Sequence, residues 1–214
     1  TLGCKLNFSE TSSLSRDSLK YGYENVNSKD FADIYVFNTC SVTENANKET
    51  RKLIRRSKRI NPNAFITLIG CYAQLKPEEI IDFKDVNLVL GTADKFDLLS
   101  HLDKIDTSGD IKSSIGGNIN DIKIFNPSFS NDDRTRSFLK VQDGCDYSCT
   151  FCTIPLARGR SRSSSINKTI NIAKDISRTN TKEIVLTGIN IGDFGKGTNE
   201  SFYELIKQMD SQID

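Results

Sequence analysis

The chain has 214 residues, of which 36% are hydrophobic and 27% are charged, an ordinary balance for one large or two small globular domains. This balance excludes a disordered or collagen-like chain. Because 29 basic residues accompany 28 acidic ones, the formal net charge is only +1, and any nucleic-acid surface must be local. No apolar run reaches the roughly 18 residues of a membrane span, and the first residues do not form a signal peptide. We therefore expect a cytoplasmic protein with no membrane partner.

Helices and strands alternate in the first half. Residues 1–3 are expected to end a strand, and Asn7-Phe8-Ser9-Glu10 has the form of a capping box, which predicts a helix running toward Lys20. Apolar runs predict strands at 33–39, 65–70 and 88–90, followed by helices at 43–59, from Pro77 onward and at 95–102. This order predicts an α/β fold with a doubly wound parallel sheet.

A segment rich in Ser, Asn, Gly and Asp, residues 107–134, separates the two halves. It predicts a domain boundary near residue 130, with an N-terminal domain at 1–130 and a second domain at 131–214. The short apolar stretch 122–125 is expected to be an edge strand or to dock this linker on one domain.

In the second half, a strand at 137–142, a helix at 166–176, a strand at 183–188 and a helix at 202–209 predict a right-handed βαβ unit. Two parallel strands are too few to close a barrel. Because the only methionine is Met209, the chain does not begin with one, and we expect it to be a fragment. Its two parallel strands would be the start of a (β/α) barrel. In such barrels the reactive residues follow the carboxyl ends of the strands.

Three of the six cysteines form a CxxxCxxC loop: Cys145, Cys149 and Cys152. Zinc would fit poorly, because the only histidine, His101, is distant in sequence. Three thiolates would hold three irons of a 4Fe-4S cluster and leave the fourth iron open to a ligand. The spacing, with the aromatic Phe151 before the last cysteine, resembles the radical S-adenosylmethionine enzymes, which implies that S-adenosylmethionine binds the open iron.

The other cysteines are Cys4, Cys40 and Cys71, and each lies just beyond the carboxyl end of a predicted strand. The carboxyl ends of parallel strands meet at one edge of the sheet, where such sheets bind ligands. We therefore predict a second iron-sulfur cluster there. The alternative is three separately buried cysteines, since cysteine is among the most buried residue types.

The two cysteine groups together resemble the methylthiotransferases, a radical S-adenosylmethionine family with a cluster-bearing N-terminal domain. The resemblance covers nearly the whole chain and rests on these motifs: Gly3-Cys4-Lys5-Leu6-Asn7, Asn38-Thr39-Cys40-Ser41-Val42, Gly70-Cys71-Tyr72-Ala73-Gln74, and the signature from Gln142 through Cys152 to Ser163. The run Ala157-Arg158-Gly159-Arg160-Ser161-Arg162-Ser163 is most similar to the branch that modifies N6-threonylcarbamoyladenosine beside the tRNA anticodon.

This resemblance implies two 4Fe-4S clusters, S-adenosylmethionine, a tRNA substrate and a reductant protein of the flavodoxin or ferredoxin type. It assigns the radical-generating cluster to Cys145, Cys149 and Cys152, and the auxiliary cluster, which presents sulfur, to the N-terminal cysteines. The product would carry a methylthio group at C2 of the adenine. The resemblance also places Phe151, Gly188 and Asn190 at the cofactor, although Gly188 also suits an ordinary strand-to-loop turn.

Two groups of basic residues are candidates for RNA phosphate contacts. Arg158, Arg160 and Arg162 follow the cysteine loop, and the predicted helix at 43–59 carries a second group, for which a solvated helix face is the alternative. That second group consists of Lys48, Arg51, Lys52, Arg55, Arg56, Lys58 and Arg59.

Other functions stay open on the sequence alone. The substrate would instead be isopentenyladenosine in tRNA or an aspartate of a ribosomal protein in the other branches of the family. The chain would also suit a radical enzyme with a single cluster, or a non-catalytic iron-sulfur or zinc protein that binds nucleic acid. The sulfur source and the oligomeric state are not encoded in any motif.

Overall fold

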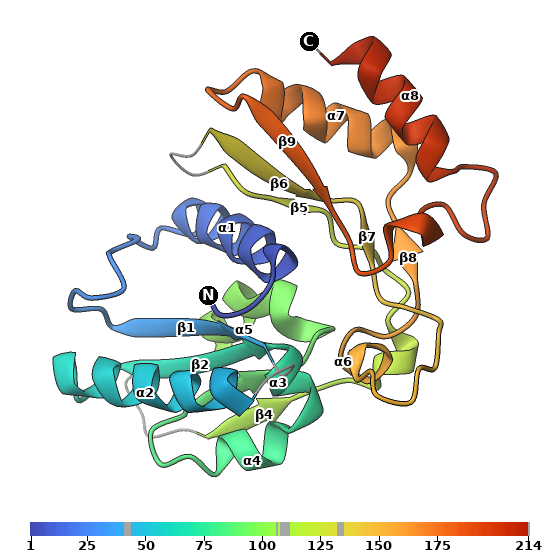
Figure 1. Ribbon diagram of the computed structural model, residues 1–214. Helices are drawn as coiled ribbons and strands as arrows, with labels where there is room; N and C mark the ends of the chain where they lie inside the picture. The colour runs from blue at the N-terminus through green and yellow to red at the C-terminus, as the bar shows by residue number, and fades with distance from the viewer. Residues whose placement is uncertain (41–43, 106, 108–111, 132–134, 214) are drawn as a thin grey trace.

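The structure is a computed structural model that describes residues 1–40, 44–105, 107, 112–131 and 135–213. A four-stranded sheet forms the centre of the first half (Figure 1). Its strands are β1 (Ile34–Thr39), β2 (Phe65–Gly70), β3 (Leu88–Leu90) and β4 (Ser113–Ile115), and neighbouring strands pair in parallel in this order. The predicted parallel sheet is confirmed. β4 was not predicted, because its residues Ser113, Ser114 and Ile115 lack the apolar run of a buried strand.

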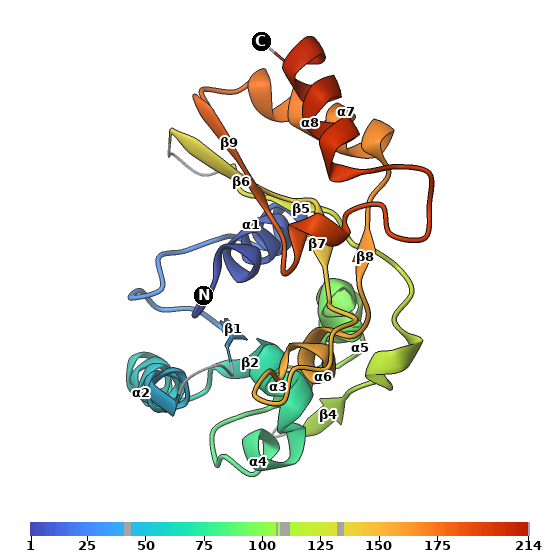
Figure 2. The same cartoon turned by 45° about the vertical axis from the view of Figure 1, so that its right-hand side comes forward.

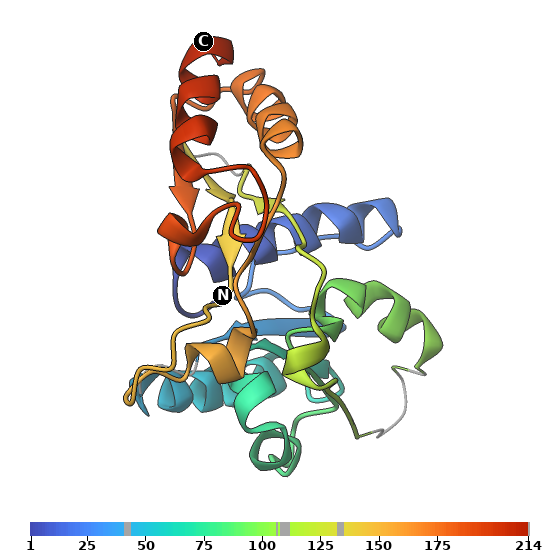
Figure 3. The ribbon, with the colours of Figure 1, turned by 90° about the vertical axis from the view of Figure 1, so that its right-hand side faces the viewer.

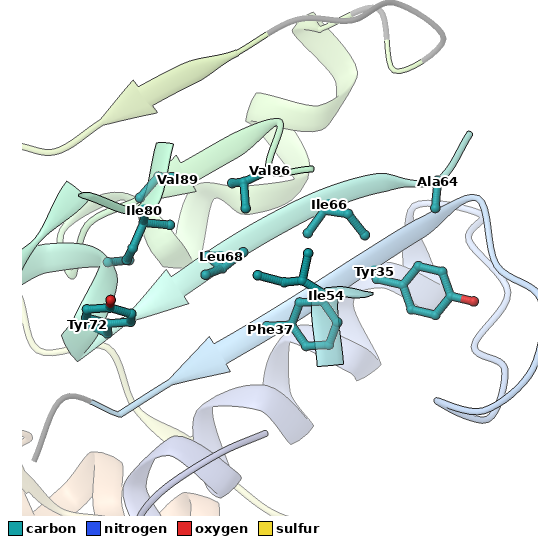
Figure 4. Close-up of a cluster of buried hydrophobic side chains, with 11 residues drawn as sticks. Tyr35, Phe37, Ile54, Ala64, Ile66, Leu68, Tyr72, Ile80, Val86 and Val89 are labelled. Carbon is teal, nitrogen blue, oxygen red and sulfur yellow. The ribbon is translucent and has the colours of Figure 1, made fainter. Parts of the chain in front are cut away.

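Helices cover both faces of this sheet, as the doubly wound prediction requires. The helices and 3-10 turns of the first half are α1 (Lys5–Lys20), α2 (Glu44–Ile60), α3 (Cys71–Leu75), α4 (Pro77–Ile81), η1 (Asp94–Asp97), α5 (Leu98–Lys104) and η2 (Ile119–Asp121). Alternate residues of β2 serve the two faces, because side chains of a strand point to opposite sides. Ile66 and Leu68 pack with Ile54 of α2 on one face (Figure 4), whereas Phe65 and Ile69 pack with α1 and α5 on the other.

The second half contains a three-stranded sheet in the order β5, β6, β9. Its elements are β5 (Ser128–Phe129), β6 (Arg136–Lys140), β7 (Gln142–Asp143), α6 (Ile154–Arg158), β8 (Arg162–Ser163), α7 (Ile166–Ser177), β9 (Glu183–Thr187), η3 (Ile191–Asp193) and α8 (Phe202–Gln212). β6 and β9 are parallel and α7 connects them, which confirms the predicted βαβ unit. α7 and α8 pack on the outer face of the sheet (Figure 1).

Residues 1–3 form no strand, contrary to the prediction that a strand ends there. The capping box is also wrong, and of the two alternatives for residues 122–125 the edge strand is excluded. The residues of the expected capping box lie inside α1, which begins at Lys5, and the side chains of Asn7 and Glu10 are buried in tertiary contacts. Residues 122–125 form no strand; the edge strand next to β6 is β5, a few residues later. In the last two cases the contacts with distant parts of the chain, which no local pattern encodes, decide the structure.

α1 lies between the two sheets (Figure 2) and packs against both. On the side of the second half, the Phe8 and Phe138 rings meet edge to face with centroids 5.8 Å apart. Arg16 of the same helix stacks on the Phe129 ring at 4.0 Å and donates a hydrogen bond to the Phe129 carbonyl oxygen at 2.8 Å. The two halves therefore share one helix, and the division at residue 130 stays a prediction. Among the described residues, no helix is long and apolar enough to cross a bilayer.

Candidate functional site

The three cysteines of the first half lie at the carboxyl edge of the sheet. Cys40 directly follows β1, and Cys71 follows β2 as the first residue of α3. Cys4 is the residue before α1, and the backbone leading to it runs beside the end of β1, where the Leu2 amide donates to the Asn38 carbonyl oxygen at 2.8 Å.

Close contacts link these cysteines to shared neighbours. A Cβ atom placed on Gly3 would lie 2.6 Å from the Cys40 Cβ atom, so only glycine permits this approach beside Cys4. The Cys4 thiol donates to Asn7 Oδ1 at 3.8 Å, and the same oxygen accepts a hydrogen bond from Arg158 at 2.5 Å. α6, which ends at Arg158, packs on α3, which begins at Cys71. Cys4 therefore borders the polar contact between Asn7 and Arg158, and Cys40 lies beside Gly3.

The donor set of this edge suits thiolate ligation. Cys4 is exposed, Cys40 is half-buried and Cys71 is buried. Burial raises the pKa of the Cys71 thiol, and the positive charges of Arg158 and Lys95 offset only part of that rise. Within the described ranges, no three Cys, His, Asp or Glu side chains are arranged as a metal site. The three side chains are of the type that an iron-sulfur cluster binds and follow one sheet edge, but ligation by them, like the number of clusters, stays a prediction.

The second group of cysteines lies on the loop between β7 and α6. Gly144 starts the loop with a φ of +70°, and the Cys145 amide donates to the Gly159 carbonyl oxygen at 3.0 Å, which ties the start of the loop to its end. Cys145 and Cys152 are half-buried, and Cys149 is exposed. Phe151 is 90% exposed, so its ring is free to meet a ligand of this loop.

An ion pair holds the CxxxCxxC loop from the outside. The Asp146 carboxylate accepts a hydrogen bond from the Ser161 amide at 2.9 Å and pairs with Lys196 Nζ at 2.9 Å. The hydrogen bond from Lys196 and that from the Ser161 amide lower the pKa of Asp146. Lys196 Nζ also lies 5.0 Å from the centroid of the Tyr147 ring. The Tyr147 hydroxyl donates a hydrogen bond to the Asp193 carboxylate. The loop after β9 therefore helps to order the cysteine loop.

Gln142 connects the cysteine loop to the predicted cofactor residues Gly188 and Asn190. Its side-chain nitrogen donates to the Gly144 carbonyl oxygen at 2.7 Å, and its side-chain oxygen accepts from the Ile189 amide at 2.9 Å and the Asn190 amide at 2.8 Å. A Cβ atom on Gly188 would lie 3.0 Å from the Gln142 oxygen. From the sequence, Gln142 is only the first residue of the signature, with no predicted role, because no pattern shows which side chain bridges two strand ends.

Replacing Gln142 with methionine, which has a similar shape and no amide, leaves the Ile189 and Asn190 amides without their acceptor. We expect a loss of about 1–3 kcal/mol in unfolding free energy and faster hydrogen exchange at these two amides. Hydrogen-exchange mass spectrometry, with Gln212→Met near the end of α8 as a surface control, measures the effect. Unchanged exchange at residues 188–190 would show that the bridge does not order this loop.

α6, which follows the cysteine loop, packs on α3 of the first half (Figure 3). Thr92 donates its hydroxyl hydrogen to the Ala157 carbonyl oxygen at 2.6 Å across this contact. Because α3 begins with Cys71, the helix that follows one cysteine group lies against the helix that begins at the other.

Five buried charged side chains lie where α1, α6 and the two sheets meet. Glu10 pairs with Lys95 at 2.7 Å, with Lys140 at 3.1 Å and with Arg158 at 3.1 Å. Asp143 pairs with Arg158 at 3.0 Å and with Lys140 at 3.4 Å. All five side chains are at most 2% exposed. We call these residues, Glu10, Lys95, Lys140, Asp143 and Arg158, the buried ion cluster.

Attraction between opposite charges favours the ionised forms of Glu10, Asp143 and Arg158, whereas burial lowers the pKa of Lys95. Burial alone would raise the pKa of Glu10, but Arg158, Lys95 and Lys140 hold it well below its ordinary value. Burial would lower the pKa of Arg158, and Glu10 and Asp143 hold it above its ordinary value. None of these residues was predicted as part of a charge cluster, since they are far apart in sequence.

The arginines after the cysteine loop have different surroundings. Arg158 is 1% exposed, so the prediction that it contacts RNA phosphates does not agree with its burial. Arg162 is largely covered and donates to the Arg158 carbonyl oxygen at 2.6 Å and to Asp143, whereas Arg160 is exposed. RNA contacts of Arg160 and Arg162 stay a prediction. On α2, Arg51 pairs with Glu79 and stacks on Phe83.

Comparison with known proteins agrees with these motifs. Residues 1–91 match the model of "Uncharacterized protein family UPF0004". The chain is 38% identical over 221 residues to "Threonylcarbamoyladenosine tRNA methylthiotransferase MtaB" of Bacillus subtilis (strain 168), covering 100% of this chain and 48% of the relative. It is 37% identical over 210 residues to the protein of the same name from Aquifex aeolicus (strain VF5), covering 98% and 51%.

A second group of relatives is less similar. The "tRNA-2-methylthio-N(6)-dimethylallyladenosine synthase" of Clostridium beijerinckii is 33% identical over 218 residues, covering 98% of this chain and 48% of the relative. The chain thus spans about half the length of the curated relatives it matches. Both groups are tRNA-modifying proteins by name, and the MtaB proteins share more identical residues with this chain. The chain belongs to the methylthiotransferase family.

Proposed function

We propose that the protein carrying this chain is a tRNA methylthiotransferase that adds a methylthio group to C2 of N6-threonylcarbamoyladenosine beside the anticodon. The observation that carries the proposal is the arrangement of the cysteines. Cys4, Cys40 and Cys71 border one sheet edge, and the helix after Cys145, Cys149 and Cys152 packs on the helix that begins at Cys71. The identity to MtaB proteins over the whole chain supports the choice of substrate.

Two 4Fe-4S clusters and S-adenosylmethionine would supply the radical and sulfur-transfer chemistry when bound. The residues of this chain hold and orient them. Cys145, Cys149 and Cys152 would ligate one cluster, and Cys4, Cys40 and Cys71 the other. Gln142 fixes the loop that contains Gly188 and Asn190 beside the CxxxCxxC loop. The backbone of residues 188–190 would bind the amino group of the cofactor. Phe151, which is exposed on the cysteine loop, would supply an apolar contact to the cofactor.

Replacing Cys4, Cys40 and Cys71 together with alanine should halve the iron content, from about eight irons per chain to about four. Each three-cysteine group holds its own cluster in this proposal, so the CxxxCxxC cluster remains. Anaerobic reconstitution followed by iron and sulfide quantification and electron paramagnetic resonance measures both clusters. Cys145/Cys149/Cys152→Ala is the matched variant and should also retain about four irons.

Equal iron content near four in the wild type and in the Cys4/Cys40/Cys71→Ala variant would contradict the proposal. It would leave a radical enzyme with a single cluster, in which the N-terminal cysteines hold no iron.

Substrate choice is tested separately. The reconstituted full-length protein is incubated with S-adenosylmethionine, a reductant and tRNA that carries either N6-threonylcarbamoyladenosine or isopentenyladenosine. We expect the methylthio product only from the first tRNA, by mass spectrometry of the nucleosides. Product only from the second would place the protein in the isopentenyladenosine branch, and product from a ribosomal protein would reject a tRNA substrate. In this proposal the protein acts in the cytoplasm, together with its tRNA substrate. Its electron donor is a flavodoxin or ferredoxin.

A further inference from the structure

The buried ion cluster has more positive than negative groups. Lys95, Lys140 and Arg158 are three buried cations, and Glu10 and Asp143 are two buried carboxylates. Without Arg158 the four remaining charges balance. Arg162 adds a further cation at the side of Asp143, in a more exposed position. An excess buried charge is costly unless an opposite charge lies nearby.

Arg158 is also the member of the cluster that contacts both halves. Its two terminal nitrogens reach Glu10 and Asn7 of α1 and Asp143 of β7, and the helix that it ends, α6, packs on α3, which begins at Cys71. Asn7 in turn accepts from the Cys4 thiol. The surplus charge therefore lies beside the cysteines of the first half, although Arg158 itself follows the CxxxCxxC loop by only a few residues.

We propose that Arg158 is a positioning residue that couples the two cysteine sites: thiolates that ligate iron at Cys4, Cys40 and Cys71 balance its surplus buried charge and thereby lock α6 and the CxxxCxxC loop onto the first half. This inference rests on the proposed iron-sulfur site of the first half. Two consequences follow. Iron binding at that site stabilises α6, and the Arg158 charge favours the reduced, more negative state of the iron-sulfur cluster bound there.

The test uses the protein with Cys145, Cys149 and Cys152 replaced by alanine, in which only the N-terminal site can take up iron. In this background, iron loading should slow hydrogen exchange of α6 by at least about tenfold. With Arg158→Met added, loading should change exchange of α6 by less than about twofold. Arg160→Met, at an exposed arginine two residues later, is the matched control and should behave as the parent protein.

A redox titration of the same proteins separates charge from packing. Arg158→Met should shift the reduction potential of the N-terminal cluster to more negative values, because a positive charge beside it is lost. Arg158→Lys keeps the charge but has no planar fork to reach Asn7, Glu10 and Asp143 together. We expect its potential to stay near that of the parent while the protection of α6 is weakened.

The outcomes distinguish the two ideas. Failure of the N-terminal site to bind iron would overturn the proposed function and this inference together. Iron that binds while α6 exchanges equally in the parent and Arg158→Met proteins, or a potential that does not move, would overturn the inference alone. If Arg158→Met does not fold, Arg158→Lys is compared with Arg160→Met. The coupling is supported if iron loading slows hydrogen exchange of α6 in Arg160→Met but no longer does so in Arg158→Lys, and it is overturned if both variants respond equally.

Discussion

Replacing Glu10 with glutamine should lower the unfolding free energy by about 3–5 kcal/mol, the cost of leaving buried charges without their partner. The Glu10 carboxylate contacts Lys95, Lys140 and Arg158, and the neutral amide would leave only Asp143 to oppose these three cations. Urea denaturation of the metal-free protein at pH 7 measures the effect. Glu24→Gln, at an exposed carboxylate, is the matched control and should change stability by less than about 0.5 kcal/mol.

This loss should depend on pH in a defined direction. The pKa of Glu10 is held well below its ordinary value of 4.5 by Arg158, Lys95 and Lys140. A carboxyl group whose folded pKa is lowered contributes stability above its unfolded pKa and loses it as the pH falls through the folded pKa. The difference between wild type and Glu10→Gln should therefore be constant near neutrality and shrink below pH 4.5. Equal stability of Glu10→Gln and Glu24→Gln would show that the buried ion cluster contributes nothing.

Replacing Gly144 with alanine should remove the cluster from the CxxxCxxC loop. Gly144 has a φ of +70°, and a Cβ atom there would lie 2.1 Å from the Arg160 carbonyl oxygen. The left-handed backbone conformation, which is unfavourable for alanine, and the steric collision together should lower the unfolding free energy by roughly 2–5 kcal/mol. Relief of the collision moves Arg160 and Gly159 away and breaks the hydrogen bond from the Cys145 amide. Iron quantification in the Cys4/Cys40/Cys71→Ala background measures the loss directly.

Gly197 provides the control for the backbone strain alone. It has a φ of +82°, and a Cβ atom there would meet nothing within 4 Å. Gly197→Ala should therefore cost only about 1–2 kcal/mol and leave the iron content unchanged. Full iron occupancy in Gly144→Ala would show that the turn does not set the position of the cysteine loop.

The amino-acid sequence by itself determined the parallel sheet and the βαβ unit of this protein. The apolar runs of β1, β2 and β3 and the helical spacing in α7 were sufficient, because burial on both faces of a parallel sheet leaves a continuous apolar pattern. The same runs indicated where β1 and β2 end, which is why the positions of Cys40 and Cys71 at one sheet edge were predictable. Cys4 follows no strand, and the contact of Leu2 with the end of β1 brings the backbone before it to that edge. The CxxxCxxC spacing needed no tertiary information at all.

Only the tertiary structure decided how the two halves meet. Glu10 and Asn7 have the pattern of a helix start in the sequence, yet they lie inside α1 because its neighbours supply buried cations and thiols. Arg158 has the sequence context of an exposed RNA-binding arginine, yet α6 packs on α3 and buries it. Periodicity reports the contacts of an element with its core, whereas charge pairing between elements far apart in the chain leaves no local pattern, so it becomes visible only once the fold brings those side chains together.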